Sequence, residues 1–185
     1  MAGQRKHPAD TGESCRVFEL RPGNPKIQLH TGAEECYVIS GELHVMGSVH
    51  DVGKITVPAE ILSKPGKLTA PEWAMIKEHP QLGYEILKKI DFPWPVAKAV
   101  WQHHERMDGS GYPQGLKGAD ITLFGRILAV SDVVESMASH RPYRPARGID
   151  AALAEIETNA GRLYDADVVA ACLRLFREKG YAMPV

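Results

Sequence analysis

The sequence predicts an all-α protein, a bundle of roughly six or seven helices behind an irregular N-terminal segment. From Ala33 onward, apolar residues recur with helical spacing, prolines stand where helices would begin, and glycines stand where they would end. No alternating run of apolar and polar residues is convincing as a strand. These observations together favour a helical bundle.

The N-terminal segment, residues 1–34, shows no sustained helical period and contains Pro8, Pro22 and Pro25 among several glycines. We therefore expect it to be irregular, followed by a single helical domain over residues 35–185. A chain of 185 residues with 44% hydrophobic and 24% charged residues has an ordinary size and composition for one such domain.

The helices of this domain are predicted in order along the chain. A first helix is expected from about Glu35 into His50. Pro80 fits the first turn of a second helix, and Pro95 fits the start of a third. The apolar positions of these two are Tyr84, Leu87 and Ile90, and then Val96 and Val100, with His104 on the same face.

Three further helices are predicted in the C-terminal half. The first covers about Leu123–Ser139, and the other two are closed by Gly161 and Gly180. Their apolar stripes are Ile127, Val130, Val134 and Met137; Ile149, Leu153, Ile156 and Ala160; and Val168, Val169, Cys172, Leu173 and Phe176. Loops are expected at about 105–120 and 140–147.

Charge and cysteine content exclude several classes of function. The formal net charge is −1, so a nucleic-acid polymer is not expected as a partner, although a small anion needs only a few local cations. Cys15, Cys36 and Cys172 form no close pair, which is typical of reduced thiols in the cytoplasm. No apolar run resembles a membrane span or a signal peptide, and a cytoplasmic location is therefore predicted.

Histidines and aspartates at four places carry the candidate chemistry. His50 and Asp51 are consecutive, and His79 precedes a helix-opening proline. His103 and His104 close a helix, and Asp132 lies mid-helix among apolar neighbours. Taken singly, each has an ordinary structural explanation, such as a helix cap or a buried ion pair.

Taken together, these residues suit a site for two divalent metal ions. The candidate ligands are His50, Asp51, His79, His103, His104 and Asp132. Asp51 can bridge two ions with its two oxygens. Mixed imidazole and carboxylate ligands suit iron or manganese and also accommodate zinc or nickel. Two metals about 3.5–4 Å apart can stabilise attack on phosphorus.

Cations that could meet a phosphate lie nearby in the sequence. Lys54 follows the His-Asp pair, and Gly53 between them allows close backbone approach. Arg141 and Arg144 lie in the proline-stiffened stretch "SHRPYRPAR", where they are phosphate ligands or ordinary surface residues. Glu135, on the face of Asp132, could orient a water or give a proton, or could be solvent-facing charge.

The order "HDVGK … HP … HHE … DGSGYP … SDVVE … RPYRP" resembles the HD-GYP domain, a branch of the HD superfamily of metal-dependent phosphohydrolases. The resemblance runs from about Glu42 to about Lys179. It implies hydrolysis of cyclic di-GMP to linear pGpG, to GMP, or to both. It also implies catalytic roles for Asp51, Lys54 and Glu135. The other implied contacts are metal ligation by the six residues above, phosphate binding by Lys54, Arg141 and Arg144, and a ligand site lined by Gly111 and Tyr112.

The chain departs from that family at two places. His140 stands where many members have aspartate, and upstream Glu13 stands where a histidine is usual. Prolines then interrupt the helix that should follow Glu13. The alternative is therefore a module that binds a cyclic dinucleotide or another protein with little or no turnover. A general HD hydrolase of mononucleotides is disfavoured by the GYP loop. A homodimer, or a signalling partner such as a diguanylate cyclase, is the expected assembly.

Overall fold

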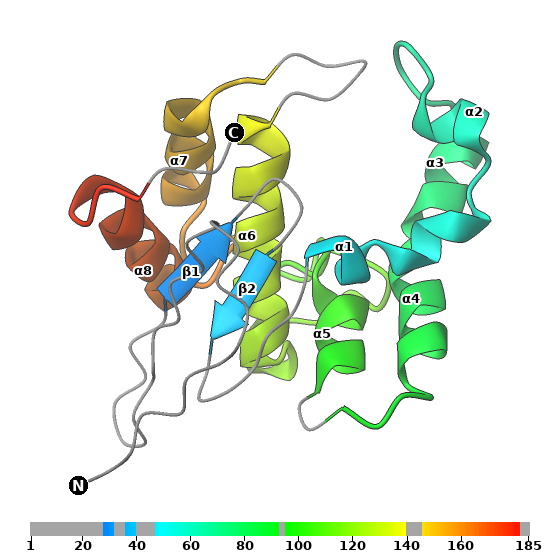
Figure 1. Cartoon of the computed structure of the whole chain (residues 1–185), viewed down its shortest axis with the longest axis horizontal. Helices are drawn as coiled ribbons and strands as arrows, with labels where there is room; N and C mark the ends of the chain where they lie inside the picture. Colours follow the sequence, from blue (N-terminus) through cyan, green and yellow to red (C-terminus); the bar gives the residue numbers. More distant parts are fainter. Residues whose placement is uncertain (1–27, 32–35, 40–46, 93–94, 140–145, 182–185) are drawn as a thin grey trace, which may run out of the picture.

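The structure, a computed structural model, describes residues 28–31, 36–39, 47–92, 95–139 and 146–181. Within these ranges it is a helical bundle with one two-stranded hairpin, which confirms the predicted all-α class and adds the hairpin to it (Figure 1). The helices are α1 (Gly47–His50), the 3-10 helix η1 (Val52–Thr56), α2 (Ala59–Leu62), α3 (Ala70–Lys77), α4 (His79–Leu87), α5 (Val96–Gln102), the 3-10 helix η2 (Gly118–Asp120), α6 (Leu123–Ala138), α7 (Ile149–Thr158) and α8 (Ala166–Arg177).

Helix α6 is the centre of the bundle. Helices α7 and α8 lie on one side of it, and α5 followed by α4 lies on the other, with α2 and α3 beyond α4 (Figure 1). Helix α6 has 16 residues. Three positions of its predicted apolar stripe, Ile127, Val130 and Val134, are almost fully buried. Because α6 has neighbours on both sides, the residues on its two flanks meet different parts of the molecule.

Prolines and glycines mark the ends of several helices. Pro80 lies in the first turn of α4, and Pro95 is the N-cap of α5, as predicted. Gly161 and Gly180 follow α7 and α8 with φ angles of 75° and 63°, a left-handed conformation that glycine adopts without strain. Asp165 caps α8 by accepting hydrogen bonds from two backbone amides of its first turn.

The helix predicted from Glu35 to His50 is wrong. Its first part contains strand β2 (Cys36–Ile39), which pairs antiparallel with β1 (Gln28–Thr31), and of the described residues in this stretch Gly47–His50 is helical. The sequence of β2, Cys-Tyr-Val-Ile, is rich in β-branched and aromatic residues that favour strands, and four residues are too few to distinguish the two periods.

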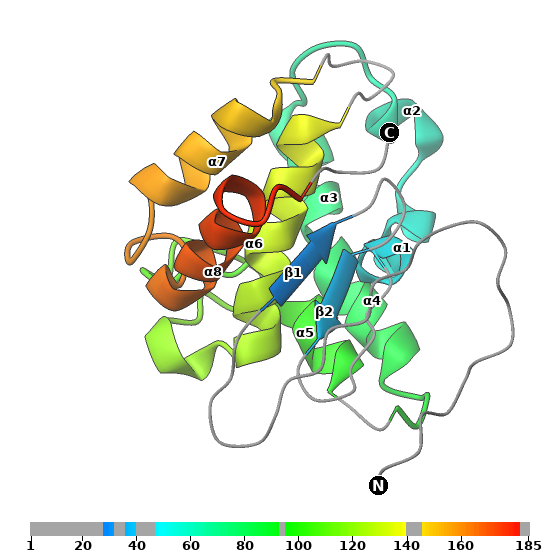
Figure 2. The same cartoon turned by 60° about the vertical axis from the view of Figure 1, so that its left-hand side comes forward.

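The hairpin also changes the picture of the N-terminal segment. Strand β1 lies inside the segment 1–34 that was predicted to be irregular, while residues 1–27 lie outside the described residues. Both strands lie against α6, and β1 also lies against α8 (Figure 2). The division of the chain at residue 34 stays a prediction, and the hairpin spans it.

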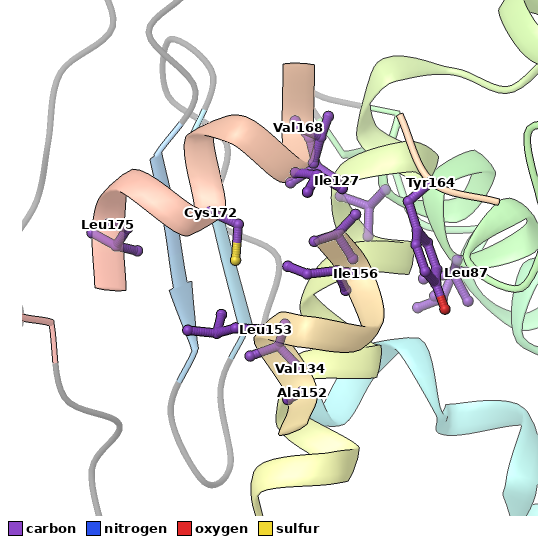
Figure 3. Close-up of a cluster of buried hydrophobic side chains, with 14 residues drawn as sticks. Leu87, Ile127, Val134, Ala152, Leu153, Ile156, Tyr164, Val168, Cys172 and Leu175 are labelled. Atoms are coloured by element: carbon purple, nitrogen blue, oxygen red, sulfur yellow. The ribbon is translucent and has the colours of Figure 1, made fainter. Parts of the chain in front are cut away.

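The main hydrophobic core lies between α6, α7 and α8 and continues toward α4 and α5 (Figure 3). Ile156 and Val168 are fully buried, and Cys172 is 1% exposed. Burial raises the pKa of the Cys172 thiol to about 12, so this cysteine is an inert part of the core. The core therefore makes α6 a rigid support for side chains on its opposite flank.

Among the described residues, no helix combines the length and the apolar character that crossing a bilayer requires.

Replacing Ile156 by alanine tests this core. The side chain is fully buried, and deletions of this kind cost about 2–5 kcal/mol of unfolding free energy. The matched control is Ile55→Ala, because Ile55 is 81% exposed and its truncation should cost less than about 0.5 kcal/mol. Urea denaturation of both variants measures the difference. Equal losses in the two variants would contradict the packing described here.

Candidate metal centre

The fold brings all six predicted ligands into one cluster. His50 ends α1, Asp51 is the N-cap of η1, and His79 is the first residue of α4. The other three are His103 and His104, directly after α5, and Asp132, in the middle of α6. Helix ends and one helix flank thus converge on a common space between α4, α5 and α6.

His79 and His103 are held in the same way by the backbone. Nδ1 of His79 is 2.7 Å from the carbonyl oxygen of Ile76, and Nδ1 of His103 is 2.5 Å from that of Val100. A carbonyl oxygen only accepts, so each Nδ1 carries the proton that it donates. Each neutral ring is then left with a bare lone pair on Nε2.

The two lone pairs face each other. Nε2 of His79 and Nε2 of His103 are 3.3 Å apart in a buried place. Burial lowers the pKa of both rings, that of His103 to about 3, so neither ring acquires a second proton that could form a hydrogen bond across this gap. Two acceptors in contact away from water are stabilised by a cation that both can bind.

Two carboxylates surround the imidazoles. Oδ1 of Asp51 is 3.4 Å from Nε2 of His79 and has no hydrogen-bond partner although it is buried. Oδ1 of Asp132 is 3.5 Å from Nε2 of His50, and its Oδ2 is 3.9 Å from Nδ1 of His104. The buried Nδ1 of His50 also lacks a partner. Orphaned donors and acceptors of this kind are costly unless something binds them.

The charges of four of the six side chains are already biased toward metal ligation. His50 is an exception, because its burial is outweighed by the hydrogen bond to Asp132 and the charge of Asp51, which raise its pKa. Burial opposes the ionisation of Asp132, but a hydrogen bond from His50 and the nearby histidines hold its pKa well below the usual range. Burial also lowers the pKa of His104. Metals require carboxylates that are ionised and imidazoles that are neutral, and the cluster keeps Asp132, His79, His103 and His104 in those forms.

Two groups of three ligand atoms lie close enough to hold a cation. One is His79, His103 and His104, and the other is His50, Asp51 and His103, with all atoms of each group within 4.8 Å of one another. The donor set and the orphaned atoms fit a divalent metal. Mixed nitrogen and oxygen donors suit first-row transition metals.

Lys54 stands at the edge of this cluster. Its Nζ is 2.5 Å from Oδ2 of Asp51, and both side chains are about one quarter exposed, at 27% and 28%. The ammonium therefore pairs with one oxygen of a carboxylate whose other oxygen faces His79. A cation here lies between the cluster and the solvent, where an anionic ligand would arrive.

Gly53 serves the packing of the helices. A Cβ at this position would lie 2.0 Å from the carbonyl oxygen of His79 and 2.7 Å from the backbone nitrogen of Gly83. The close approach predicted for Gly53 is therefore made by the backbone of α4 against η1. It brings Asp51 and Lys54, which flank Gly53, up to the first residue of α4.

Two buried polar side chains set the position of the histidines and of the loop after them. Oε1 of Gln102 accepts hydrogen bonds from the backbone amide and hydroxyl of Thr122, at 2.9 and 2.7 Å, which joins the end of α5 to the start of α6. Glu105, only 2% exposed, accepts from the backbone amides of Gln114 and Leu116, at 2.7 and 3.0 Å. The carboxylate thus organises the loop that carries Gly111 and Tyr112.

That loop lies against the histidines of the cluster. A Cβ on Gly111 would meet backbone atoms of residues 104–106 at 2.4–2.5 Å, so only glycine fits there. The ring of Tyr112 stacks on His104 with centroids 4.7 Å apart, and its amide donates to the carbonyl oxygen of His104 at 3.2 Å. Tyr112, predicted to offer a flat face to a ligand, therefore already packs against a histidine of the cluster.

The remaining predicted residues are placed as follows. Glu135 is half-buried on α6, one turn after Asp132. Arg141 and Arg144 lie outside the described residues. Sequence reasoning gave no role to Gln102 or Glu105, although Glu105 belongs to the quoted "HHE" motif and precedes a glycine-rich loop, which was the available signal.

Comparison with known proteins agrees with this geometry. A family model described as "HD domain" matches residues 38–168. The chain belongs to the HD domain family. The resemblance to its HD-GYP branch is confirmed by this match and by the named relatives that follow.

Two curated relatives of this HD domain are enzymes by name. A cyclic di-GMP phosphodiesterase of Thermotoga maritima is 41% identical over 155 residues, covering 83% of this chain and 42% of that protein. The 3'3'-cGAMP-specific phosphodiesterase 3 of Vibrio cholerae is 40% identical over 123 residues, covering 66% of this chain and 27% of that protein. The chain thus spans less than half the length of either relative.

A solved structure shows the same fold. An HDG"Y"P protein from Bdellovibrio bacteriovorus superposes with a TM-score of 0.52 at 18% identity, covering 66% of this chain and 39% of that chain. The helical arrangement around the cluster is therefore that of the HD domain.

Substituting Gly53 by alanine tests the seating of η1 on α4. The added methyl must push against backbone, and overpacking of this kind costs about 1–3 kcal/mol. We expect lower stability in chemical denaturation and, because Asp51 moves with η1, less bound metal. Gly83→Ala is the comparison, since its Cβ would meet the side chain of Val100 at 3.0 Å and would not meet backbone closer than 3.6 Å. A Gly53 variant as stable and as metal-rich as wild type would contradict the close contact.

Replacing Asp132 by asparagine tests the metal site. Losing an outer-shell partner of a metal typically costs about 10- to 100-fold in affinity, so losing a charged ligand should cost at least that. Titration with Mn(II) and metal analysis after dialysis measure the loss. Asp165→Asn is the matched control, because Asp165 caps α8 and pairs with Arg126 at 2.6 Å. It should lower stability and retain the metal, and equal metal loss in both variants would rule out a specific role for Asp132.

Proposed function

We propose that this protein is a metal-dependent phosphodiesterase that hydrolyses cyclic di-GMP to linear pGpG, to GMP, or to both. The observation that supports this most is the pair of bare imidazole nitrogens of His79 and His103, 3.3 Å apart and beside the carboxylates of Asp51 and Asp132. The substrate named for the Thermotoga relative supports the choice of cyclic di-GMP.

The six clustered residues would hold two divalent ions, with Asp51 bridging and with iron or manganese as the expected metals. Four imidazoles and two carboxylates with two oxygens each can supply more ligand atoms than one ion needs, which supports a site for two. When bound, such ions supply Lewis-acid stabilisation of the charge that develops on a phosphodiester.

The residues around the cluster have separate roles in this proposal. Lys54 would leave Asp51 in part and donate to a phosphate oxygen, as a charge-assisted contact. Arg141 and Arg144 would hold the second phosphate. Gly111 and Tyr112 would line the ligand site, where Tyr112 already covers one edge of the cluster through His104.

The reaction breaks one bond and forms one. The oxygen of a water molecule attacks phosphorus, and the bond between phosphorus and the 3'-oxygen of the ribose breaks. The water oxygen stays on what becomes the 5'-phosphate of pGpG, and one proton moves to the 3'-oxygen. Glu135, half-buried one turn from Asp132, would orient the water or transfer this proton.

Removing Asp51 tests the proposed activity. The purified protein, loaded anaerobically with Fe(II) or Mn(II), should release linear product from cyclic di-GMP, and Asp51→Ala should lower the rate by about a hundredfold or more. Chromatography of the products measures both. Asp91→Ala removes an exposed aspartate outside the cluster and should behave as wild type.

The same experiment separates the proposal from its alternative. If wild type and Asp51→Ala are equally inactive with each metal, while wild type still binds cyclic di-GMP, the protein is a binding module. A second copy of the chain or a signalling protein such as a diguanylate cyclase would then be the partner to seek.

A further inference from the structure

An aromatic series leads outward from the buried cluster. The ring of Tyr112 stacks on His104, and the indole of Trp73 lies edge-on to Tyr112 with centroids 6.3 Å apart. His104 is largely buried, Tyr112 is half-buried, and Trp73 is 43% exposed. Trp73 thus lies two rings out from His104 and is exposed enough for its indole to meet a flat ligand group.

A lysine lies over the outer two rings. Nζ of Lys77 is 5.4 Å from the ring centroid of Tyr112 and 5.7 Å from that of Trp73, within the usual range of cation–π contacts. In the described part of the chain, Lys77 has neither a salt bridge nor a side-chain hydrogen bond. By contrast Lys88, which also lies 5.4 Å from an aromatic centroid, pairs with Glu85 at 2.5 Å. The three donors of Lys77 are therefore available.

The helix that carries both residues is capped at its start. Thr69 and Glu72 form a capping box at the start of α3, and Lys64 binds both carboxylate oxygens of Glu72 at 2.8 Å. Trp73 lies one turn after Thr69, and Lys77 ends α3 two residues before His79. Both side chains therefore lie on a capped helix that adjoins the cluster.

We propose that Trp73 and Lys77 form a base-binding rim that selects guanine. This inference rests on the proposed function. The indole of Trp73 would stack on the base, and the ammonium of Lys77 would donate to O6 and N7, the two acceptors on the edge of guanine. Adenine presents a donor amino group in place of O6, which repels a lysine.

The relatives of this chain are named for substrates that differ in their bases. The Thermotoga protein is named for cyclic di-GMP and the Vibrio protein for 3'3'-cGAMP, in which one guanine is replaced by adenine. The phosphates of these substrates are alike, so groups that contact only phosphate cannot distinguish them. Side chains beside the cluster that meet the base can.

Lys77→Met and Trp73→Ala test the rim. Rates are measured on cyclic di-GMP, 3'3'-cGAMP, cyclic di-AMP and bis(p-nitrophenyl) phosphate, which has no base. Lys77→Met should lower kcat/KM for cyclic di-GMP about tenfold, mainly through KM, and should narrow the preference for guanine over adenine. Trp73→Ala should lower kcat/KM for the three cyclic dinucleotides more than kcat/KM for bis(p-nitrophenyl) phosphate. Lys77→Arg, which keeps donors for O6 and N7, should restore selectivity.

Matched controls and the remaining outcomes decide the question. Lys88→Met removes a lysine over a different ring, that of Tyr84, and should leave base selectivity unchanged. If the Lys77 and Trp73 variants change the rates on all four substrates by one common factor, or change no rate, the proposed base-binding rim is wrong. A wild-type protein that hydrolyses bis(p-nitrophenyl) phosphate but no cyclic dinucleotide overturns the proposed function instead. In that case the affinities for GMP and AMP, measured by calorimetry, test the rim. The rim is supported if Lys77→Met lowers the affinity for GMP alone, and any other result contradicts it.

Discussion

Two hydrogen bonds to the backbone determine the character of this site. The carbonyl oxygens of Ile76 and Val100 take the Nδ1 protons of His79 and His103, so both Nε2 lone pairs point into one buried space. Without a cation, that space contains facing acceptors and an unpartnered oxygen of Asp51. Burying these polar atoms without a partner costs folding free energy, and binding a metal ion between them offsets that cost.

The rest of the fold keeps those two rings in place. Gln102 ties the end of α5 to the start of α6, and Gly53 lets η1 lie directly on α4. Helix α6 is packed by its core flank against α7 and α8 (Figure 1), and its other flank supplies Asp132. Core burial therefore supplies the rigidity that a buried polar cluster needs, because half-satisfied networks relax unless the surrounding backbone prevents it.

A second level of organisation extends the site to the surface. Glu105 holds its loop through two backbone amides, which places Tyr112 on His104. On the neighbouring helix α3, Trp73 meets Tyr112 edge-on and Lys77 lies over the Tyr112 ring. In the function proposed here, phosphate chemistry and base recognition are consequently separate tasks of adjoining elements, and one loop couples them.

Much of this could be predicted without the structure. Pro80, Pro95, Gly161 and Gly180 mark helix ends because proline and glycine restrict or free the backbone locally. The six candidate ligands stood out because imidazoles and a carboxylate among apolar residues are expensive to bury. Such signals are local, and a local cause is readable from the chain alone.

The remainder depended on contacts between distant residues. Strand β2 was mistaken for helix because four apolar residues fit either period, and its pairing with β1 decides the matter. The tautomers of His79 and His103, the orphaned oxygen of Asp51 and the amides held by Glu105 arise only when separate helices and loops meet. The sequence by itself determined which chemical groups are present and where prolines or glycines begin or end α4, α5, α7 and α8. The tertiary structure alone decided which lone pairs face each other, because direction and distance between side chains are properties of packing.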